Sequence, residues 1–184
     1  MGRQNHLTTG TAIADCRQDQ RFILQTPLVK QARQYDAAID QYQKTLEMEP
    51  TRGEALLGLG MVYEQKSMYE EAINQYQKAI ASLGRTSPVL AQLGHAYAMS
   101  GKKTEAIKVV GEFKEIAKQG FRGSYDSAIL YTGLGERDKA FEQLNNAYEE
   151  RSGWIIYLKV EPQFDSLRAD PRYASLLQRM NLSP

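Results

Sequence analysis

The chain has 184 residues, 42% of them hydrophobic and 24% charged, which suits one ordinary globular domain or a short repeat array and excludes a disordered chain. A formal net charge of +1 gives no electrostatic support for binding nucleic acid or an anionic membrane. No apolar run approaches the roughly 20 residues that cross a bilayer, and the N-terminal stretch has no continuous apolar core of a signal peptide. The single cysteine, Cys16, excludes an internal disulfide, so we expect a reducing, cytoplasmic setting.

The N-terminal residues 1–27 share no pattern with the rest of the chain, and we expect a flexible or non-repeat segment there. Alternatively, the stretch FILQTPLVKQA (22–32) supplies a bent helix that packs on the next one. If it does not, the helix expected over residues 35–48 exposes one apolar face, and such a face favours self-association. The candidate residues for that contact are Ile39, Tyr42 and Leu46.

A repeat with a fixed period of 34 residues begins at residue 35. The stretch YDAAIDQYQKTL (35–46) returns as YEEAINQYQKAI (69–80). The same spacing relates several further series, namely Ala38, Ala72, Ala106 and Ala140, then Tyr63, Tyr97 and Tyr131, then Gly60, Gly94 and Ala128. A fixed period of this length is typical of a stacked-repeat architecture.

The apolar spacing predicts a pair of helices in each repeat unit. Residues 54–66 place Leu56, Leu59 and Tyr63 on one helical face, and residues 69–82 show the same spacing. The short break between the two helices carries glycine in the later units, which suits a helix end that needs a left-handed residue. Small residues at the repeat positions indicate that the paired helices approach closely.

These residues resemble the tetratricopeptide repeat family. The matching motifs are L-x-x-L-G-x-x-Y at 56–63 and 90–97, A-I-x-x-Y-x-x-A at 72–79, and Pro50 at the end of the first unit. The resemblance covers residues 28–152, as one partial and three fuller repeats. It implies an all-α fold, a right-handed superhelical solenoid of antiparallel helix pairs.

The C-terminal residues 153–184 leave the repeat pattern. Asp170 and Pro171 form a helix start, and an apolar stripe follows, which is typical of a helix that caps the last exposed face of a solenoid. The stripe consists of Tyr173, Leu176, Leu177 and Met180. Residues 123–182 are also similar to the tails of bacterial multidomain proteins, namely tetratricopeptide-bearing serine/threonine kinases, TolB-like proteins and winged-helix transcriptional regulators. In those proteins the stretch is accessory and non-catalytic, which implies an interaction module.

Candidate chemistry is sparse. His95 is expected on the groove surface, with Ser87, Ser100, Glu105 and Asp126 close in sequence, but no pattern fixes the geometry that nucleophilic catalysis requires. We therefore expect a groove histidine without a catalytic role, and no enzyme activity. The sequence contains no C-x-x-C, no H-x-x-x-H and no glycine-rich phosphate loop, so we expect neither a metal nor another cofactor.

By the resemblance, the first helices of the units line a concave groove that binds a protein or peptide. The residues expected there are Leu57, Met61, Glu64, Gln65, Ala91, His95, Ala98, Met99, Arg122, Tyr125, Ile129 and Thr132. Adaptable methionines beside aromatic residues suit the docking of a peptide or helix. The alternative at these positions is packing beneath the C-terminal segment. For the function, the alternatives to a non-catalytic scaffold are a regulatory domain that senses a small ligand and, further off, a hydrolase. A second copy of the chain is a further candidate partner.

Overall fold

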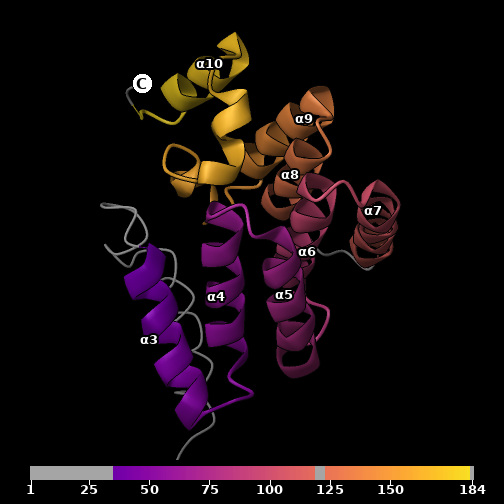
Figure 1. Cartoon of the computed structure of the whole chain (residues 1–184). Coiled ribbons are helices and arrows are strands. Elements are labelled where there is room, and N and C mark those ends of the chain that lie inside the picture. The colour runs from indigo at the N-terminus through magenta and orange to yellow at the C-terminus, as the bar shows by residue number, and fades with distance from the viewer. Residues whose placement is uncertain (1–34, 119–122, 183–184) are drawn as a thin grey trace, which may run out of the picture.

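The computed structural model describes residues 35–118 and 123–182, and all regular structure in these two ranges is helical (Figure 1). The repeat region contains α3 (Tyr35–Met48), α4 (Gly53–Gln65), α5 (Tyr69–Leu83), α6 (Ser87–Met99), α7 (Lys103–Lys118), α8 (Ser124–Gly133) and α9 (Arg137–Glu149). The C-terminal region contains two short 3₁₀ helices, η1 (Ile155–Tyr157) and η2 (Pro162–Leu167), and α10 (Pro171–Arg179). The predicted all-α fold is confirmed. The expectations for residues 1–27 and 22–32 lie outside the described residues.

The helices pack as consecutive pairs. Helix α4 packs on α5, α6 on α7, and α8 on α9, while contacts of α5 with α6 and of α6 with α8 join one pair to the next. Helix α3 packs on α4 as the second helix of the partial unit. The helices α4 and α5 begin and end within one residue of the predicted bounds, because the apolar spacing and the break fix both ends.

Small residues allow this close packing. A methyl group added at Gly60 would collide with the ring of Tyr76, and one added at Gly94 would collide with the side chain of Leu130. The alanines of the repeat series are buried at Ala38, Ala72, Ala106 and Ala140. The small residues that recur every 34 positions therefore mark the places where helices contact each other closely.

The same backbone turn ends α4, α6 and α8. Ser67, Gly101 and Gly135 occupy equivalent positions and all have positive φ angles, of 59°, 82° and 75°. After each of them a backbone N–H reaches back across the last helical turn to a carbonyl. The donor and acceptor residues are Met68 and Tyr63 (2.9 Å), Lys102 and Tyr97 (2.8 Å), and Glu136 and Tyr131 (2.9 Å). This hydrogen bond closes a helix at a left-handed residue, as the sequence predicts for the two glycine-containing breaks.

The C-terminal helix caps the array. Its start is as predicted, because the Asp170 carboxylate accepts a hydrogen bond from the backbone N–H of Arg172 at 3.0 Å. The apolar stripe of α10 faces the core, where Tyr173, Leu176 and Leu177 are buried, and α10 packs on α9. The predicted capping helix is thus confirmed.

The segment between α9 and α10 packs against the repeat helices. It turns back along the array, so that η2 packs on α8 and the segment lies beside the end of α4 (Figure 1). Leu158, Phe164 and Leu167 are completely buried, and the ring of Phe164 meets that of Tyr125 edge-on at 5.5 Å. We call residues 155–167 the return segment and the face formed by α4, α6 and α8 the inner face. The return segment therefore covers the part of the inner face that α8 forms.

Candidate functional site: a pocket on the inner face

The twelve predicted groove residues fall into three groups. The first group is buried: Ala91, Tyr125 and Ile129 belong to one apolar cluster with Ile155, Leu158, Phe164 and Leu167 of the return segment. All three positions are buried, and the ring of Tyr125 meets that of Phe164 in the return segment. They therefore follow the alternative of packing inside the fold and leave no open surface for a partner.

The second group consists of four residues, Leu57, Ala98, Met61 and Arg122. Leu57 and Ala98 are buried, at 6% and 8% exposure, and Leu57 packs in the core of its own helix pair. Met61 is half-buried against the same core. Arg122 lies outside the described residues. An open groove along the whole inner face is therefore corrected to a shorter opening.

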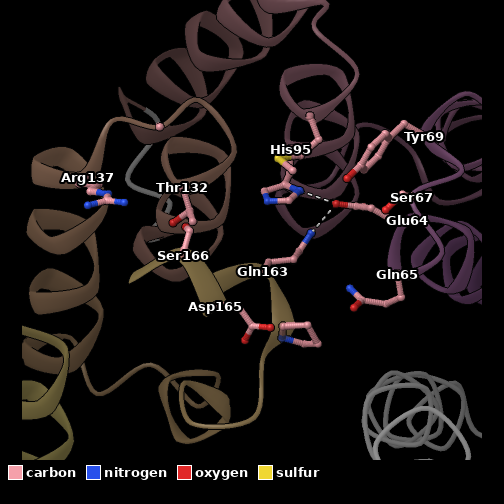
Figure 2. A pocket seen from close by; sticks show the side chains of 13 residues that line it. Glu64, Gln65, Ser67, Tyr69, His95, Thr132, Arg137, Gln163, Asp165 and Ser166 are labelled. Carbon is pink, nitrogen blue, oxygen red and sulfur yellow. Dashed lines mark hydrogen bonds and ion pairs between the residues drawn. The ribbon is translucent and has the colours of Figure 1, made fainter. Parts of the chain in front are cut away.

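The third group surrounds that opening, which we call the inner pocket, a cavity of about 410 Å³. Its predicted members are Glu64, Gln65, His95, Met99 and Thr132. The remaining lining residues are Ser67, Tyr69, Gly135, Arg137, Pro162, Gln163, Asp165 and Ser166 (Figure 2). The pocket is thus bounded by the C-terminal ends of α4, α6 and α8, by the turns after α4 and α8, and by the return segment.

The buried carboxylate of Glu64 lies in the pocket lining and binds three other side chains. Its Oε2 accepts a hydrogen bond from the Tyr76 hydroxyl at 2.7 Å, and its Oε1 accepts one from Gln163 Nε2 at 3.1 Å. The same Oε1 is paired with His95 Nδ1 (Figure 2). Because Glu64 is 6% exposed, these partners replace the water that the carboxylate loses on burial.

The Tyr76 hydroxyl is a permanent donor in this cluster. Burial raises the pKa of Tyr76 well above its ordinary value, and the neighbouring Glu64 carboxylate raises it further. The phenol therefore stays protonated at any physiological pH and keeps its hydrogen bond to Glu64.

Gln163 anchors the return segment to the inner face. Its Nε2 donates to Glu64 on α4 and, at 2.8 Å, to Gln92 Oε1 on α6. Its own Oε1 is buried and has no hydrogen-bond partner among the described residues. One amide group thus ties the C-terminal segment to two different repeat units.

The polar groups that could have formed a hydrolase site are separated into two pairs. His95 is paired with Glu64, whereas the Ser87 hydroxyl donates to Asp126 Oδ2 at 2.6 Å. Burial raises the pKa of Asp126 to about 6, although the hydrogen bond from Ser87 lowers it. No hydrogen bond joins His95 to a serine among residues 35–118 and 123–182. The described residues also contain no group of three or more His, Cys, Asp or Glu side chains placed to hold a metal ion.

Several pocket residues were not predicted. Gln163, Asp165 and Ser166 lie in the stretch that leaves the repeat pattern, so no period places them against α4. Arg137 and Tyr69 occupy equivalent positions, each the first residue of a second helix, 68 positions apart in sequence (137 − 69). That equivalence is a signal that could have found both residues, since a helix start after the turn lies close to the end of the first helix.

Comparisons with known proteins support the repeat assignment. Residues 28–88 match the family model described as Tetratricopeptide repeat. A solved tetratricopeptide repeat protein from Parabacteroides merdae ATCC 43184 is 18% identical, with 82% of this chain and 60% of that chain covered and a TM-score of 0.51. The search of curated proteins found no match.

Two further solved structures are similar at lower TM-scores. MamA is 23% identical over 79% of this chain and 85% of that chain, with a TM-score of 0.46. YrrB, described as a TPR protein with an unusual peptide-binding site, is 16% identical over 96% of this chain and 93% of that chain, with a TM-score of 0.47.

The family match, the likeness to the Parabacteroides protein and the stacked helix pairs together confirm the predicted fold class, a tetratricopeptide-repeat solenoid closed by a C-terminal helix. No helix within the described ranges has the length and apolar character needed to span a bilayer. The resemblance of residues 123–182 to the tails of kinases and TolB-like proteins stays a prediction.

Proposed function

We propose that this protein is a non-catalytic scaffold that binds a segment of another protein at the inner pocket. The observation that carries the proposal is the pocket itself. The return segment packs on α8, and beside it a cavity of about 410 Å³ lies over the C-terminal ends of three first helices. A fold of stacked helix pairs supports a role in protein interaction, and the cavity opens on the inner face with exposed side chains, such as those of Met99 and Pro162, in its lining.

The pocket offers both apolar and polar contacts to a peptide. Met99 is 46% exposed, and Pro162 is also exposed, so together they present apolar surface. Gln65 and Tyr69 are half-buried and line the other side. A flexible methionine beside polar groups is suited to short segments of varied sequence.

A peptide-display selection against the immobilised chain tests the proposal. We expect a random nonapeptide library to yield binders, and Met99→Glu to weaken the binding of a selected peptide at least about tenfold, because a charge replaces an apolar contact. The matched control is Ile107→Glu on the outer helix α7, where the side chain is 60% exposed. Equal loss of binding in both variants, or none in either, would place the peptide away from the inner pocket.

A small ligand is the second candidate, because the pocket volume lies within the range of small-molecule sites. Thermal unfolding in the presence of a metabolite library separates the two candidates. A ligand that binds only the folded state raises the unfolding midpoint, and Met99→Glu should abolish that rise. In this case the protein acts as a regulatory sensor domain.

Self-association remains part of the proposal. In α3 only Ala38 is buried, whereas the predicted contact residues Ile39, Tyr42 and Leu46, also in α3, are half-buried. Light scattering of the full chain and of Tyr42→Glu tests this: a dimer that the substitution converts to a monomer supports self-association through α3. A bacterial origin and a cytoplasmic location are likewise proposals, and they rest on the C-terminal resemblance and the single cysteine.

A further inference from the structure

Helix α7 exposes an apolar side chain that its repeat equivalents bury. Ile73, Ile107 and Phe141 lie in the second helices of three successive units, each 34 positions from the next. Ile73 is 4% exposed and Phe141 is 2% exposed, whereas Ile107 is 60% exposed. The exposure of Ile107 therefore follows from the placement of α7 and not from its position in the repeat.

The two equivalents are covered by the helix that follows them. Ile73 belongs to one apolar cluster with Val89 of α6. The guanidinium group of Arg172 in α10 lies over the ring of Phe141, 4.3 Å from the ring centroid. Helix α7, by contrast, packs on α6 and makes few contacts with α8, and Figure 1 shows it standing apart from α8 and α9. Ile107 thus occupies a position that a further helix covers in the neighbouring units.

A cleft of about 180 Å³ lies between α7 and the next unit. Lys114 lies on the α7 side of it, and Tyr131 of α8 and Gln143 of α9 lie on the other side. Lys114 is the only charged side chain that the described residues contribute to this lining. Across the cleft, Lys139 lies over the ring of Tyr131 and is paired with Glu136. The cation of Lys114 therefore has no counterpart in the lining.

One side of α7 continues this cleft along the helix. Lys103, Ile107, Val110 and Lys114 follow one another at helical spacing, and we call the surface that they form the open face. Beside it, a Cβ added at Gly111 would meet no neighbouring atom within 4 Å. The open face is therefore accessible to another chain over its whole length.

The charges of α7 are divided between its sides. Lys103 and Lys114 form no ion pair with any described residue. The carboxylates of α7 all lie on other sides of the helix, at Glu105, Glu112 and Glu115. That of Glu112 already pairs with Arg85, in the loop before α6, at 2.5 Å. The open face thus combines apolar side chains with positive charge and has no carboxylate of its own.

We propose that the open face binds an amphipathic helix of a partner protein, at a site separate from the inner pocket. A helix is the fitting occupant, because a helix covers the equivalent position in the units on both sides. Its apolar stripe packs on Ile107 and Val110, and acidic residues beside the stripe face Lys103 and Lys114. The open face spans about 17 Å, which corresponds to about three turns of the partner helix.

A display selection on the full chain tests this inference. The probe is a library of peptides of about 18 residues with a strongly helix-forming background and one randomised face. We expect the selected peptides to carry apolar residues at helical spacing, with Asp or Glu enriched beside them. A proline in the middle of a selected peptide should abolish binding, because it breaks the helix.

Variants of the chain then place the bound peptide. Ile107→Glu should weaken a selected peptide at least about tenfold, because a charge replaces an apolar contact. Lys114→Glu should weaken it at least about fivefold, and Lys114→Arg should retain most of the affinity. Two matched controls should bind as the wild type does: Ile156→Glu, at an isoleucine that is 58% exposed in the return segment, and Lys108→Glu, on another side of α7. Thermal unfolding of each variant shows that the fold is intact.

The outcomes separate this site from the inner pocket. Nonapeptides selected at the inner pocket should not respond to Ile107→Glu. Helical peptides that Ile107→Glu and Lys114→Glu leave unaffected, or a library that yields no binder, overturn the inference and leave the scaffold function standing. Light scattering tests a second copy as the occupant. A dimer of the full chain that Ile107→Glu converts to a monomer would show that the open face binds this chain itself, which also overturns the inference.

Discussion

The buried carboxyl group of Asp126 makes the stability of this protein depend on pH. Asp126 lies in the first turn of α8, is 9% exposed and accepts a hydrogen bond from the hydroxyl of Ser87 on α6. Burial raises its pKa from the ordinary 3.8 to about 6. One pKa unit is equivalent to about 1.4 kcal/mol. The raised pKa therefore means that ionised Asp126 lowers the free energy of unfolding by about 3 kcal/mol relative to the protonated form.

The direction follows from proton binding. The folded state holds the proton of Asp126 up to about pH 6, whereas the unfolded chain releases it near pH 4. The folded state thus binds more protons between these values, and stability from this group is lost as the pH rises through them. We expect Asp126→Asn, which has no proton to lose, to gain about 3 kcal/mol relative to the wild type between about pH 4 and about pH 7.

Urea unfolding followed by far-UV circular dichroism at several pH values measures this difference. A second variant, Ser87→Ala, removes the hydrogen bond that lowers the pKa of Asp126, so it should move the midpoint of the pH dependence upward. A stability difference between Asp126→Asn and the wild type that stays constant within about 0.5 kcal/mol across this range would refute the reasoning.

Three further predictions concern stability, and urea unfolding measures each of them. Phe164→Ala should cost about 3–5 kcal/mol, because the ring is fully buried in the return segment; a loss below about 1 kcal/mol would mean that the segment is only loosely held. Tyr76→Phe should cost about 1–3 kcal/mol by removing a donor from buried Glu64, and an unchanged midpoint would contradict that role. Ser67→Gly should gain up to about 1 kcal/mol at a positive φ angle, and Gly101→Ser, the reverse change in the next unit, should lose a similar amount.

The repeat region was predictable because its contacts are local. A helix pair, its turn and its small residues recur every 34 positions, so each unit supports the assignment of the others. Even the left-handed residue of each turn falls in the register, at Ser67 as well as at the two glycines, although serine carries no such signal by itself.

The candidate site was only partly predictable, because the shape and lining of the inner pocket depend on a contact between segments that are distant in sequence. The family resemblance predicted Glu64, His95 and Met99 in a groove, and in the structure they line the inner pocket. Tyr125 was predicted in the same groove, yet its ring packs on Phe164 of the return segment, whose path follows no repeat. Nothing in the sequence marks Gln163 as the residue that binds Glu64, since the two lie 99 positions apart.

That same contact alters the cooperativity expected of the array. In a linear repeat protein each unit touches only its neighbours, so the ends fray and units unfold one after another. Here Gln163 bridges α4 and α6 from beyond the last repeat, and the apolar residues beside it pack on α8. Opening any of these units breaks contacts with the return segment. We therefore expect a single unfolding transition, with amide protons in α4 and α8 protected to a similar degree. Although the architecture is modular, we thus expect the described helices to unfold as one thermodynamic unit.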